Sequence, residues 1–593
     1  MCVLLEEKGK LQPPGHEAVQ VIVKNTSQKM CFDCWKKSNG MYMVIASFSQ
    51  NIGAFQQVAV SNEADGVTGD VDTDADSPQD DGDPLLSTLK RVFHHQNFRP
   101  GQRNVIETML SGKDGLVVLP TGGGKTLCFT LPAIISDGKT LVVLPTLSLM
   151  QDLQTRLSEV CITVSLSGAT SSAEKDRVIE NITRQDSAIK VILSTPETLD
   201  DARVITALKS ACITRIIVDE AHCIDEWGHQ FRPSYLALGR IRDTLNVQVV
   251  AFTATATKHT CQTIPTQLHF GADSFLLKNS FRRDNLELCI KPKTNIKGAI
   301  GDVQRLLKTD LREQSGIIYC LTPEECNTAC VSLIDNGITC VVYHGQLSPI
   351  EKKNNLTKWL NEDISVIVAT KSLGMGIDKG NVRFVIHLSL PSSIPEYFQQ
   401  IGRAGRDGEP SLCIMYFRFN DRSLHLEHLK NVSNEFEARN ASLCLKDMLR
   451  LCLKNACLVN SVLAYFDEEV DSLCGKCSVC KSQFDSLDLT KECGHALLVL
   501  QGLISVVKNV TFALLLKILR GSREKDILAK ALDVKIPLYG CLKKMSVVRV
   551  EYMLQCMWIR NILLEESRYL LPGSQSQDVL DKKLTVTIKV QRS

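Results

Sequence analysis

The sequence predicts an α/β protein with two successive parallel-sheet domains and a smaller, mostly helical C-terminal part. From Leu85 onward, short β-rich runs alternate with helical stretches, which is the pattern of parallel strands joined by crossover helices. The chain has 593 residues and is 44% hydrophobic, enough for several domains with buried cores. We expect no membrane-spanning helix, because the chain contains no uninterrupted run of about 18 or more apolar residues.

The strand-like runs fall into two sets. The first set is GLVVLP, TLVVLP, VILST, RIIVDE and VVAFTATAT, and the second set is GIIYC, CVVYH, VIVAT and RFVIHLS. Because each set is interleaved with helical stretches, each predicts one α/β domain. We place the first domain at residues 85–285 and the second at residues 286–418.

An acidic segment precedes the first domain. Residues 62–84 combine many acidic residues with Gly and a Ser and lack aromatic residues, so we expect a flexible linker there and assign no structure to residues 1–61. Cys31 and Cys34 have zinc-like spacing without a second pair, which favours ordinary thiols. Residues 1–84 hold 13 acidic and 6 basic residues, leaving 53 acidic and 62 basic ones for the rest. That balance would suit a polyanionic partner, and the acidic segment could recruit a basic protein or only act as a tether.

A glycine-rich segment after the first strand-like run predicts a phosphate-binding loop. The loop consists of Thr121, Gly122, Gly123, Gly124, Lys125 and Thr126. Glycines let backbone N–H groups turn toward phosphates, and the following helix start adds positive potential. We expect Lys125 to reach the β/γ-phosphates of ATP and Thr126 to hold Mg2+. The first glycine of the common GxxxxGK pattern is absent, since Leu119 stands at that position.

An acidic pair follows the apolar run IIV, at the expected end of a buried strand. Asp219 and Glu220 begin the segment DEAH, and the carboxyl ends of parallel strands would place them beside the phosphate loop. Asp219 is the candidate ligand of Mg2+, and Glu220 is the candidate base that orients and deprotonates the attacking water. The alternative is a solvent-facing acidic pair, which the buried strand, His222 and the upstream Lys125 disfavour.

A paired-arginine segment, QQIGRAGRDG at residues 399–408, follows the last strand-like runs of the second domain. We expect Arg406 to stabilise negative charge on the transferred phosphoryl group from the neighbouring domain, with Arg403 in support. Such a site is complete only when the two domains close, so hydrolysis would be coupled to domain movement. The alternative is that the GRAGR turn binds nucleic acid.

These segments together resemble the motif series of the RecQ family of superfamily 2 DNA helicases, in order and spacing. The resemblance covers about residues 85–482 and is carried by FRPGQ, TGGGKT, VVLPTLSLMQDL, TPE, DEAHCIDEWGHQFRPSY, FTATAT, VATKSLGMGIDKGNVRFVIH and IGRAGRDG. It implies two tandem RecA-like parallel-sheet domains, followed by a helical zinc-binding subdomain (419–482), a winged helix (483–575) and a tail (576–593). It also implies ATP-dependent 3′ to 5′ movement on single-stranded DNA and unwinding of forked or partly duplex DNA, in DNA repair and recombination in a nucleus.

The resemblance implies nucleotide and DNA contacts as well. Gln102 would pair with adenine, with Arg99 near it. The loop after DEAH would sense single-stranded DNA through Trp227, His229, Phe231 and Arg232. Aromatic faces stack on bases and guanidinium groups hold phosphates, although an isolated Trp and Phe four residues apart are more often core residues. Asp225 and Glu226 stand where relatives commonly have smaller or neutral side chains.

A cluster of cysteines downstream has the spacing of zinc ligands. The candidates are Cys457, Cys474, Cys477 and Cys480, of which the last three form a C-x2-C-x2-C run with Cys457 separated by 16 residues. Four thiolates can complete a tetrahedral Zn2+ site, which would resemble the zinc subdomain of the family. Cys452 is the fallback ligand. Relatives often carry two arginines where this chain has Leu458 and Val459.

The C-terminal part resembles the winged-helix domain of the same family more loosely. FALLLKILRGSREKDILAKAL predicts amphipathic helices broken at Arg520–Ser522, and NILLEESRYLL predicts a short hairpin. In that hairpin we expect Tyr569 to be a packed strand residue rather than a wedge at a duplex junction. Two other functions stay open: an RNA-remodelling ATPase, which the zinc ligands and WGHQFRP disfavour, and a DNA-annealing scaffold, which Lys125, Glu220 and Arg406 disfavour.

Overall fold

The computed structural model describes most of the chain from residue 82 onward. The described residues are 18–23, 26–31, 82–120, 122–168, 170–184, 186–227, 233–374, 379–470, 472–566 and 569–591. Near the N-terminus, β1 (Ala18–Val23) and β2 (Thr26–Cys31) pair antiparallel. Among the described residues, no helix combines the length and apolar composition needed to cross a membrane.

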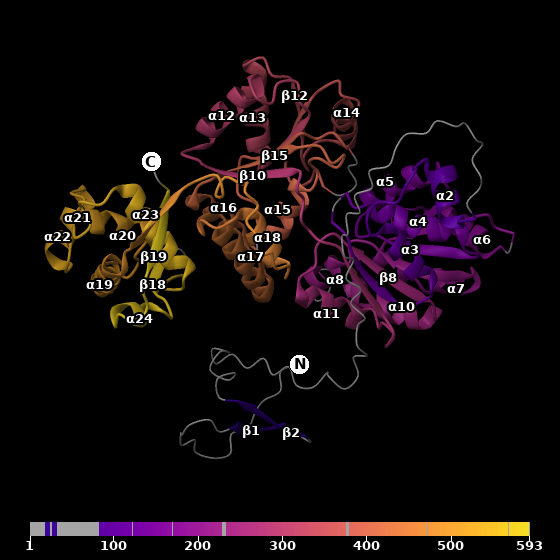
Figure 1. Cartoon of the computed structure of the whole chain (residues 1–593), viewed down its shortest axis with the longest axis horizontal. Helices are drawn as coiled ribbons and strands as arrows, with labels where there is room; N and C mark the ends of the chain where they lie inside the picture. The colour runs from indigo at the N-terminus through magenta and orange to yellow at the C-terminus, as the bar shows by residue number, and fades with distance from the viewer. Residues whose placement is uncertain are drawn as a thin grey trace, which may run out of the picture.

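The first α/β domain is coloured indigo to magenta in Figure 1. It is built on a seven-stranded parallel sheet with the strand order β5-β6-β4-β7-β8-β3-β9. Its strands are β3 (Gly115–Val118), β4 (Lys139–Val143), β5 (Thr163–Leu166), β6 (Val191–Ser194), β7 (Ile213–Val218), β8 (Gln248–Thr253) and β9 (Phe275–Lys278). Its helices are α2 (Pro84–Phe93), α3 (Gln102–Leu110), α4 (Lys125–Ile135), α5 (Leu147–Leu157), α6 (Ser172–Thr183), α7 (Ala202–Ser210), α8 (His222–Trp227), α9 (Pro233–Leu236), α10 (Leu238–Leu245) and α11 (Lys258–Gln267).

Both faces of this sheet are buried, which explains why its strands are continuous apolar runs. Along β3, Val117 packs into one hydrophobic cluster, whereas Leu116 and Val118 pack into the other. Successive side chains of a strand point to opposite faces, so a strand buried on both faces needs apolar residues at every position. The predicted class, two tandem parallel-sheet domains, is confirmed by this sheet and the next.

The second α/β domain has a six-stranded parallel sheet with the order β10-β15-β14-β11-β13-β12. Its strands are β10 (Leu286–Pro292), β11 (Gly316–Tyr319), β12 (Cys340–Tyr343), β13 (Val366–Ala369), β14 (Phe384–His387) and β15 (Ser411–Phe417). Its helices are α12 (Ile296–Lys308), α13 (Pro323–Asp335), α14 (Pro349–Leu360) and α15 (Ile394–Ile401). The segment 279–285 links β9 of the first domain directly to β10 of the second.

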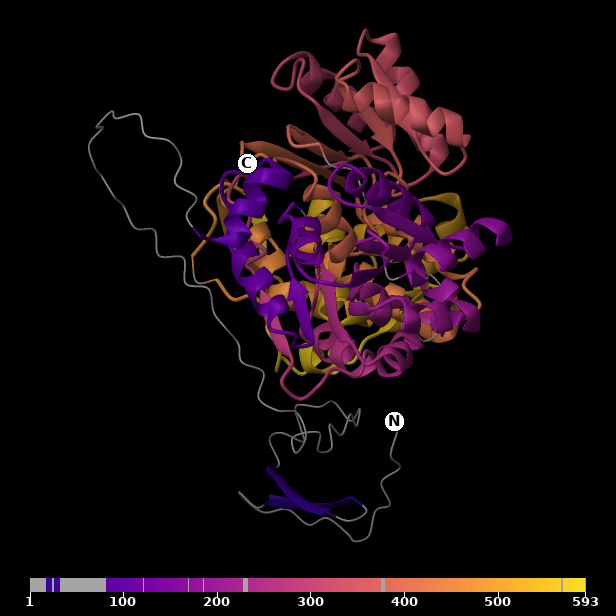
Figure 2. The ribbon, with the colours of Figure 1, turned by 90° about the vertical axis from the view of Figure 1, so that its right-hand side faces the viewer.

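Helices follow in the part predicted to bind zinc. They are α16 (Arg422–Leu429), α17 (Glu435–Leu453) and α18 (Leu458–Tyr465), and α18 leads toward the cysteine-rich turn at 474–480. Figures 1 and 2 show these helices between the first α/β domain and the C-terminal part, with the second α/β domain beside them. The zinc-binding subdomain therefore lies where the other parts of the chain meet.

The C-terminal part has its own hydrophobic core. Its elements are β16 (Phe484–Asp488), α19 (Thr490–Val506), α20 (Phe512–Arg520), α21 (Lys525–Ala529), α22 (Leu532–Lys535), α23 (Val547–Ile559), β17 (Leu563–Glu566), β18 (Tyr569–Pro572), α24 (Ser576–Leu580) and β19 (Thr587–Gln591). The region expected to be a tail thus contains α24 and β19, and β19 pairs antiparallel with β16.

The predicted hairpin is present as the antiparallel pair β17 and β18. The expectation that Tyr569 packs inside it is wrong, because Tyr569 is 37% exposed whereas the next residue, Leu570, is 1% exposed. Neighbouring residues of a strand face opposite sides, so Leu570 fills the core position and turns Tyr569 outward.

Candidate nucleotide and metal sites

The phosphate loop joins β3 to α4 at the carboxyl edge of the first sheet. Gly122 and Gly124 have φ angles of 84° and 76°, a left-handed backbone that favours glycine. Lys125 is the first residue of α4, and none of the described side chains caps this helix. Its first backbone N–H groups are therefore available to an anion. Thr121 lies outside the described residues.

The side chains of FRPGQ hold this loop from the side of α3. Gln102 donates from Nε2 to the carbonyls of Gly123 and Gly124, at 3.3 Å each, and its Oε1 accepts from the Arg99 N–H at 2.8 Å. Nη1 of Arg99 donates to the carbonyl of Gly122. Both side chains thus set the shape of the phosphate loop, and the implied pairing of Gln102 with adenine stays a prediction.

The acidic pair lies immediately after β7, and β7, β8 and β3 are consecutive neighbours in the sheet. Asp219 is half-buried, and desolvation, reinforced by the charge of Glu220, raises its carboxyl pKa to about 6 against the opposing pull of Lys125. The Oε2 atom of Glu220 is buried and has no hydrogen-bond partner among the described residues. The carboxylates of Asp219 and Glu220 lie close together near Lys125, and this arrangement fits a Mg2+ site with Asp219 as a ligand. Thr126, the other candidate Mg2+ ligand, follows Lys125 at the start of α4.

His222 connects the acidic pair to the end of β8. Its Nδ1 lies 3.5 Å from Oε2 of Glu220 and 3.1 Å from Oγ1 of Thr253. Thr253 in turn donates to the carbonyl of Thr255 at 2.8 Å. The segment FTATAT is therefore in direct contact with DEAH, which the order of the motifs in the sequence does not reveal.

Arg406 of the second domain reaches the phosphate loop of the first. A Cβ atom placed on Gly122 would lie 3.2 Å from Cγ of Arg406, so the two residues are in contact across the domain boundary. Arg403 is only 4% exposed and lies at the hydroxyl of Tyr319, whose pKa burial raises and Arg403 lowers. The two arginines therefore occupy different positions. Arg406 contacts the phosphate loop of the first domain, whereas Arg403 lies inside the second domain.

Two linker residues hold the turn that carries Arg406. Arg283 donates from Nη2 to the carbonyls of Ala404 and Gly405 at 3.1 and 2.7 Å, and Nδ2 of Asn285 donates to the same Gly405 carbonyl at 2.8 Å. No motif in the sequence indicates these residues. Their only signal is position, since they follow the last strand of the first domain.

The implied DNA sensor falls mostly outside the described residues. Trp227 ends α8, but its side chain is not described, and His229, Phe231 and Arg232 are outside the described ranges. Their contact with DNA stays a prediction.

The four predicted cysteines come together in space. The Sγ atoms of Cys457, Cys474, Cys477 and Cys480 all lie within 4.8 Å of one another. Backbone N–H groups donate to this cluster, from Leu458 to Cys477 at 3.4 Å and from Cys477 to Cys474 at 3.3 Å. Burial opposes ionisation of Cys474, but N–H donors and neighbouring thiols outweigh it and lower its pKa to about 7. Four thiols with such donors fit Zn2+, and the fallback Cys452 is not part of the group.

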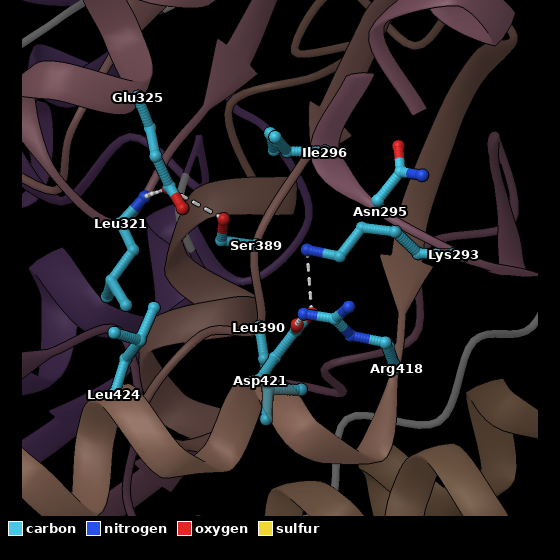
Figure 3. Close-up of a pocket in the computed structure, with 10 residues that line it drawn as sticks. All are labelled: Lys293, Asn295, Ile296, Leu321, Glu325, Ser389, Leu390, Arg418, Asp421 and Leu424. Atoms are coloured by element: carbon cyan, nitrogen blue, oxygen red, sulfur yellow. Dashed lines mark hydrogen bonds and ion pairs between the residues drawn. The ribbon is translucent and has the colours of Figure 1, made fainter. Parts of the chain in front are cut away.

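A separate cavity of about 250 Å³ lies at the carboxyl edge of the second sheet (Figure 3). It is lined by Lys293, Asn295, Ile296, Leu321, Glu325, Ser389, Leu390, Arg418, Asp421 and Leu424. Lys293 and Asp421, both buried, form an ion pair at 2.7 Å across it. None of the predicted nucleotide-site residues lines this cavity.

Known families match the chain in four consecutive segments. They are the DEAD/DEAH box helicase family (residues 99–264), the helicase conserved C-terminal domain (299–408), the RecQ zinc-binding family (419–481) and the RQC domain (483–593). With the phosphate loop on one parallel-sheet domain and Arg406 against it from the other, they define a two-domain superfamily 2 helicase.

Comparison with individual proteins assigns the chain to one family within this class of helicases. The chain is 34% identical to the putative ATP-dependent DNA helicase Q1 of Caenorhabditis elegans, over 78% of the chain and 76% of that protein. It is 30% identical to the ATP-dependent DNA helicase RecQ of Bacillus subtilis, over 85% of the chain and 84% of that protein. The chain belongs to the RecQ family of DNA helicases.

Other relatives are longer, or are alike in fold alone. The chain is 35% identical to the ATP-dependent DNA helicase hus2/rqh1 of Schizosaccharomyces pombe, over 86% of the chain but only 40% of that protein's length. A crystal structure of the DUF1998 helicase MrfA bound to DNA and AMPPNP superimposes with a TM-score of 0.50 at 20% identity, over 65% of this chain and 58% of that one. That likeness shows the shared fold of the two α/β domains.

Proposed function

We propose that the protein is an ATP-dependent DNA helicase that moves 3′ to 5′ along single-stranded DNA and separates forked or partly duplex DNA. The observation that carries the proposal is the contact of Arg406 with the phosphate loop across the two domains, beside the acidic pair Asp219 and Glu220. Family membership supports the choice of DNA over RNA.

Each residue then has a task in hydrolysis. The N–H groups of Gly122 to Lys125 and the Lys125 ammonium bind the phosphates, while Asp219 and Thr126 would hold Mg2+, which would neutralise phosphate charge. Glu220 orients the attacking water and takes its proton; its buried Oε2 makes no hydrogen bond to a described residue and lies 3.5 Å from Nδ1 of His222. Arg406 stabilises the charge that develops on the transferred phosphoryl group.

Domain movement follows from this division of the site. Arg406 and the phosphate loop both bind the γ-phosphate of ATP. When hydrolysis removes this phosphate, the two domains lose their shared ligand and can separate after each turnover. Trp227, His229, Phe231 and Arg232 would contact the strand next to DEAH, which places strand contact and hydrolysis on one segment. The cysteine cluster, holding Zn2+, would stabilise the zinc-binding subdomain. We place the activity in DNA repair and recombination in the nucleus.

An unwinding assay on two matched DNA duplexes tests the proposal. Duplexes of the same sequence with a 3′ or a 5′ single-stranded overhang are incubated with ATP and Mg2+, beside a Lys125→Ala protein as control. We expect unwinding of the 3′-overhang duplex alone, and none by Lys125→Ala, because the loop then lacks its phosphate-binding ammonium.

Three outcomes would contradict the proposal. Equal unwinding of both duplexes would refute the polarity. ATP hydrolysis that RNA strands stimulate and DNA strands do not would favour an RNA-remodelling ATPase, and annealing without unwinding by the wild type would favour a scaffold.

A further inference from the structure

The zinc-binding subdomain is fastened to the first strand of the second α/β domain. Ser478, in the cysteine turn, donates its N–H to the carbonyl of Leu288 at 2.9 Å and accepts the N–H of Ile290 on Oγ at 3.1 Å. Lys481 adds an ion pair with Glu287 at 2.6 Å. All three partners lie on β10, so the subdomain and β10 form a continuous hydrogen-bonded unit.

The same subdomain holds the first domain through two adjacent carboxylates at the end of α18. Asp467 accepts the N–H of Lys258, the first residue of α11, at 2.6 Å. Glu468 accepts the hydroxyl of Ser280 on Oε1 and the N–H of Phe281 on Oε2, the latter at 2.8 Å. An N–H in the first turn of a helix has no acceptor inside the helix, so the Asp467 carboxylate provides the acceptor for the Lys258 N–H at the start of α11. We name Asp467 and Glu468 the acidic clasp.

Aromatic packing surrounds the linker residues that the clasp binds. The ring of Phe281 lies 4.8 Å from that of Phe466 and 5.7 Å from that of Phe398, measured between centroids. Phe466 belongs to the zinc-binding subdomain and Phe398 to α15 of the second domain. Lys278, the last residue of β9, also donates to the carbonyl of Phe466 at 2.6 Å. The start of the linker is thus fixed between three parts of the chain.

The other end of the linker holds the arginine turn. Phe281, bound by Glu468, is two residues from Arg283, which donates to the carbonyl of Gly405 at 2.7 Å. Gly405 directly precedes Arg406, whose side chain contacts Gly122 of the phosphate loop. A short chain of direct contacts therefore connects Glu468 to the residue that completes the nucleotide site.

We infer that Asp467 and Glu468 are positioning residues, which hold the linker in the conformation that places Arg406 against the phosphate loop. This inference rests on the proposed function, because it assigns the clasp to ATP hydrolysis. When the clasp is made, the zinc-binding subdomain joins both domains and favours their closed arrangement. When the linker turns, its bonds to Glu468 must break, so the clasp contributes to the balance between closed and open states.

The test is ATP turnover by a Glu468→Ala protein with saturating single-stranded DNA. We expect kcat to fall about tenfold, as for loss of hydrogen bonds to a charged group, while KM for ATP stays within about twofold because the phosphate loop is intact. Glu468→Gln keeps one acceptor oxygen and should recover part of kcat, and Ser280→Ala should lower kcat less than Glu468→Ala.

Glu469→Ala is the matched control, because Glu469 is the next acidic residue, is exposed and makes no hydrogen bond to a described residue. It should hydrolyse ATP as the wild type does. Zinc content and melting temperature of each variant show whether the fold is kept.

A double-mutant cycle decides whether Glu468 acts through Arg406. In single-turnover measurements, Glu468→Ala should lower the rate in the wild-type background and have no further effect in an Arg406→Ala background. Additive losses, or a Glu468→Ala protein with wild-type kcat, would overturn the inference. A wild type without DNA-stimulated hydrolysis would instead refute the proposed function, so the two failures are distinguishable.

Discussion

At the scale of single residues, His387 shows how strongly the interior of the second domain limits ionisation. It lies on β14 at 1% exposure, and burial lowers its imidazole pKa to about 4, although a bond with Gln400 opposes the shift. Its Nε2 is 2.8 Å from Oε1 of Gln400, and its ring stacks on Tyr319 at 5.4 Å between centroids. The neutral ring therefore donates Nε2–H to Gln400.

This histidine should make stability depend on pH. In the unfolded chain, the His387 imidazole binds a proton below its ordinary pKa of 6.5. In the folded protein, the same imidazole stays neutral until the pH falls to about 4. Stability is therefore present above pH 6.5 and falls as pH drops from 6.5 toward 4, by up to about 3 kcal/mol. Urea unfolding of the second domain at pH 7, 6 and 5 should show this fall in the wild type and a smaller one in His387→Phe. Equal slopes for both proteins would contradict the assignment.

The sequence predicts an individual site residue only where that residue belongs to a short motif next to a predicted strand or helix. Lys125 and Asp219 each follow a strand within a few residues, so the motif and the fold place them together. Gln102 has a motif, but its hydrogen bonds to Gly123 and Gly124 depend on the approach of α3 to α4. Arg283 and Glu468 have partners more than 100 residues away in the sequence, and no local spacing records such contacts.

At the scale of elements, a buried ion pair contributes to the junction between the C-terminal part and the rest. Arg422, at the start of α16, bonds Glu565 of β17 at 3.0 Å, and both side chains are less than 9% exposed. The guanidinium also lies over the rings of Phe419 and Phe512, 3.9 and 5.0 Å from their centroids. The hairpin is thereby fixed to the helix that follows the second domain.

Breaking this pair should be costly. Glu565→Ala leaves the Arg422 charge buried without its partner, so we expect a loss of about 3 to 5 kcal/mol in the free energy of unfolding. Asp447→Ala, which breaks a half-exposed pair with Arg450 at 2.8 Å, is the control and should cost less than about 1 kcal/mol. Denaturant titration followed by tryptophan fluorescence measures both, and equal small losses would show that the buried pair does not hold the hairpin.

The predictable elements are those with strong periodicity. The strand runs GLVVLP and RIIVDE correspond to β3 and β7, and the break after Arg520 is a left-handed Gly521 that ends α20. The strand β19 was not predictable, because its partner β16 is about 100 residues away and its five residues alternate too briefly to be distinguished from a tail. Tertiary pairing, rather than local propensity, forms it.

At the scale of the whole molecule, the site belongs to no single domain. The first domain supplies the phosphate loop and the acidic pair, the second supplies Arg406, and the zinc-binding subdomain touches both through β10 and the acidic clasp. If the proposed function holds, a site divided in this way acts only in the closed arrangement, and this would couple hydrolysis to domain movement. The order of the motifs predicts this division, whereas the bridging role of the zinc-binding subdomain emerges only from contacts in space.

The most direct test of the shared site is single-turnover ATP hydrolysis by Arg406→Ala with single-stranded DNA and Mg2+. An arginine that enters from a second domain is typically worth about 10³-fold or more in rate, so we expect a loss of that order with ATP affinity changed only a few-fold. Hydrolysis at the wild-type rate would contradict the account, because the first domain would then be sufficient for catalysis.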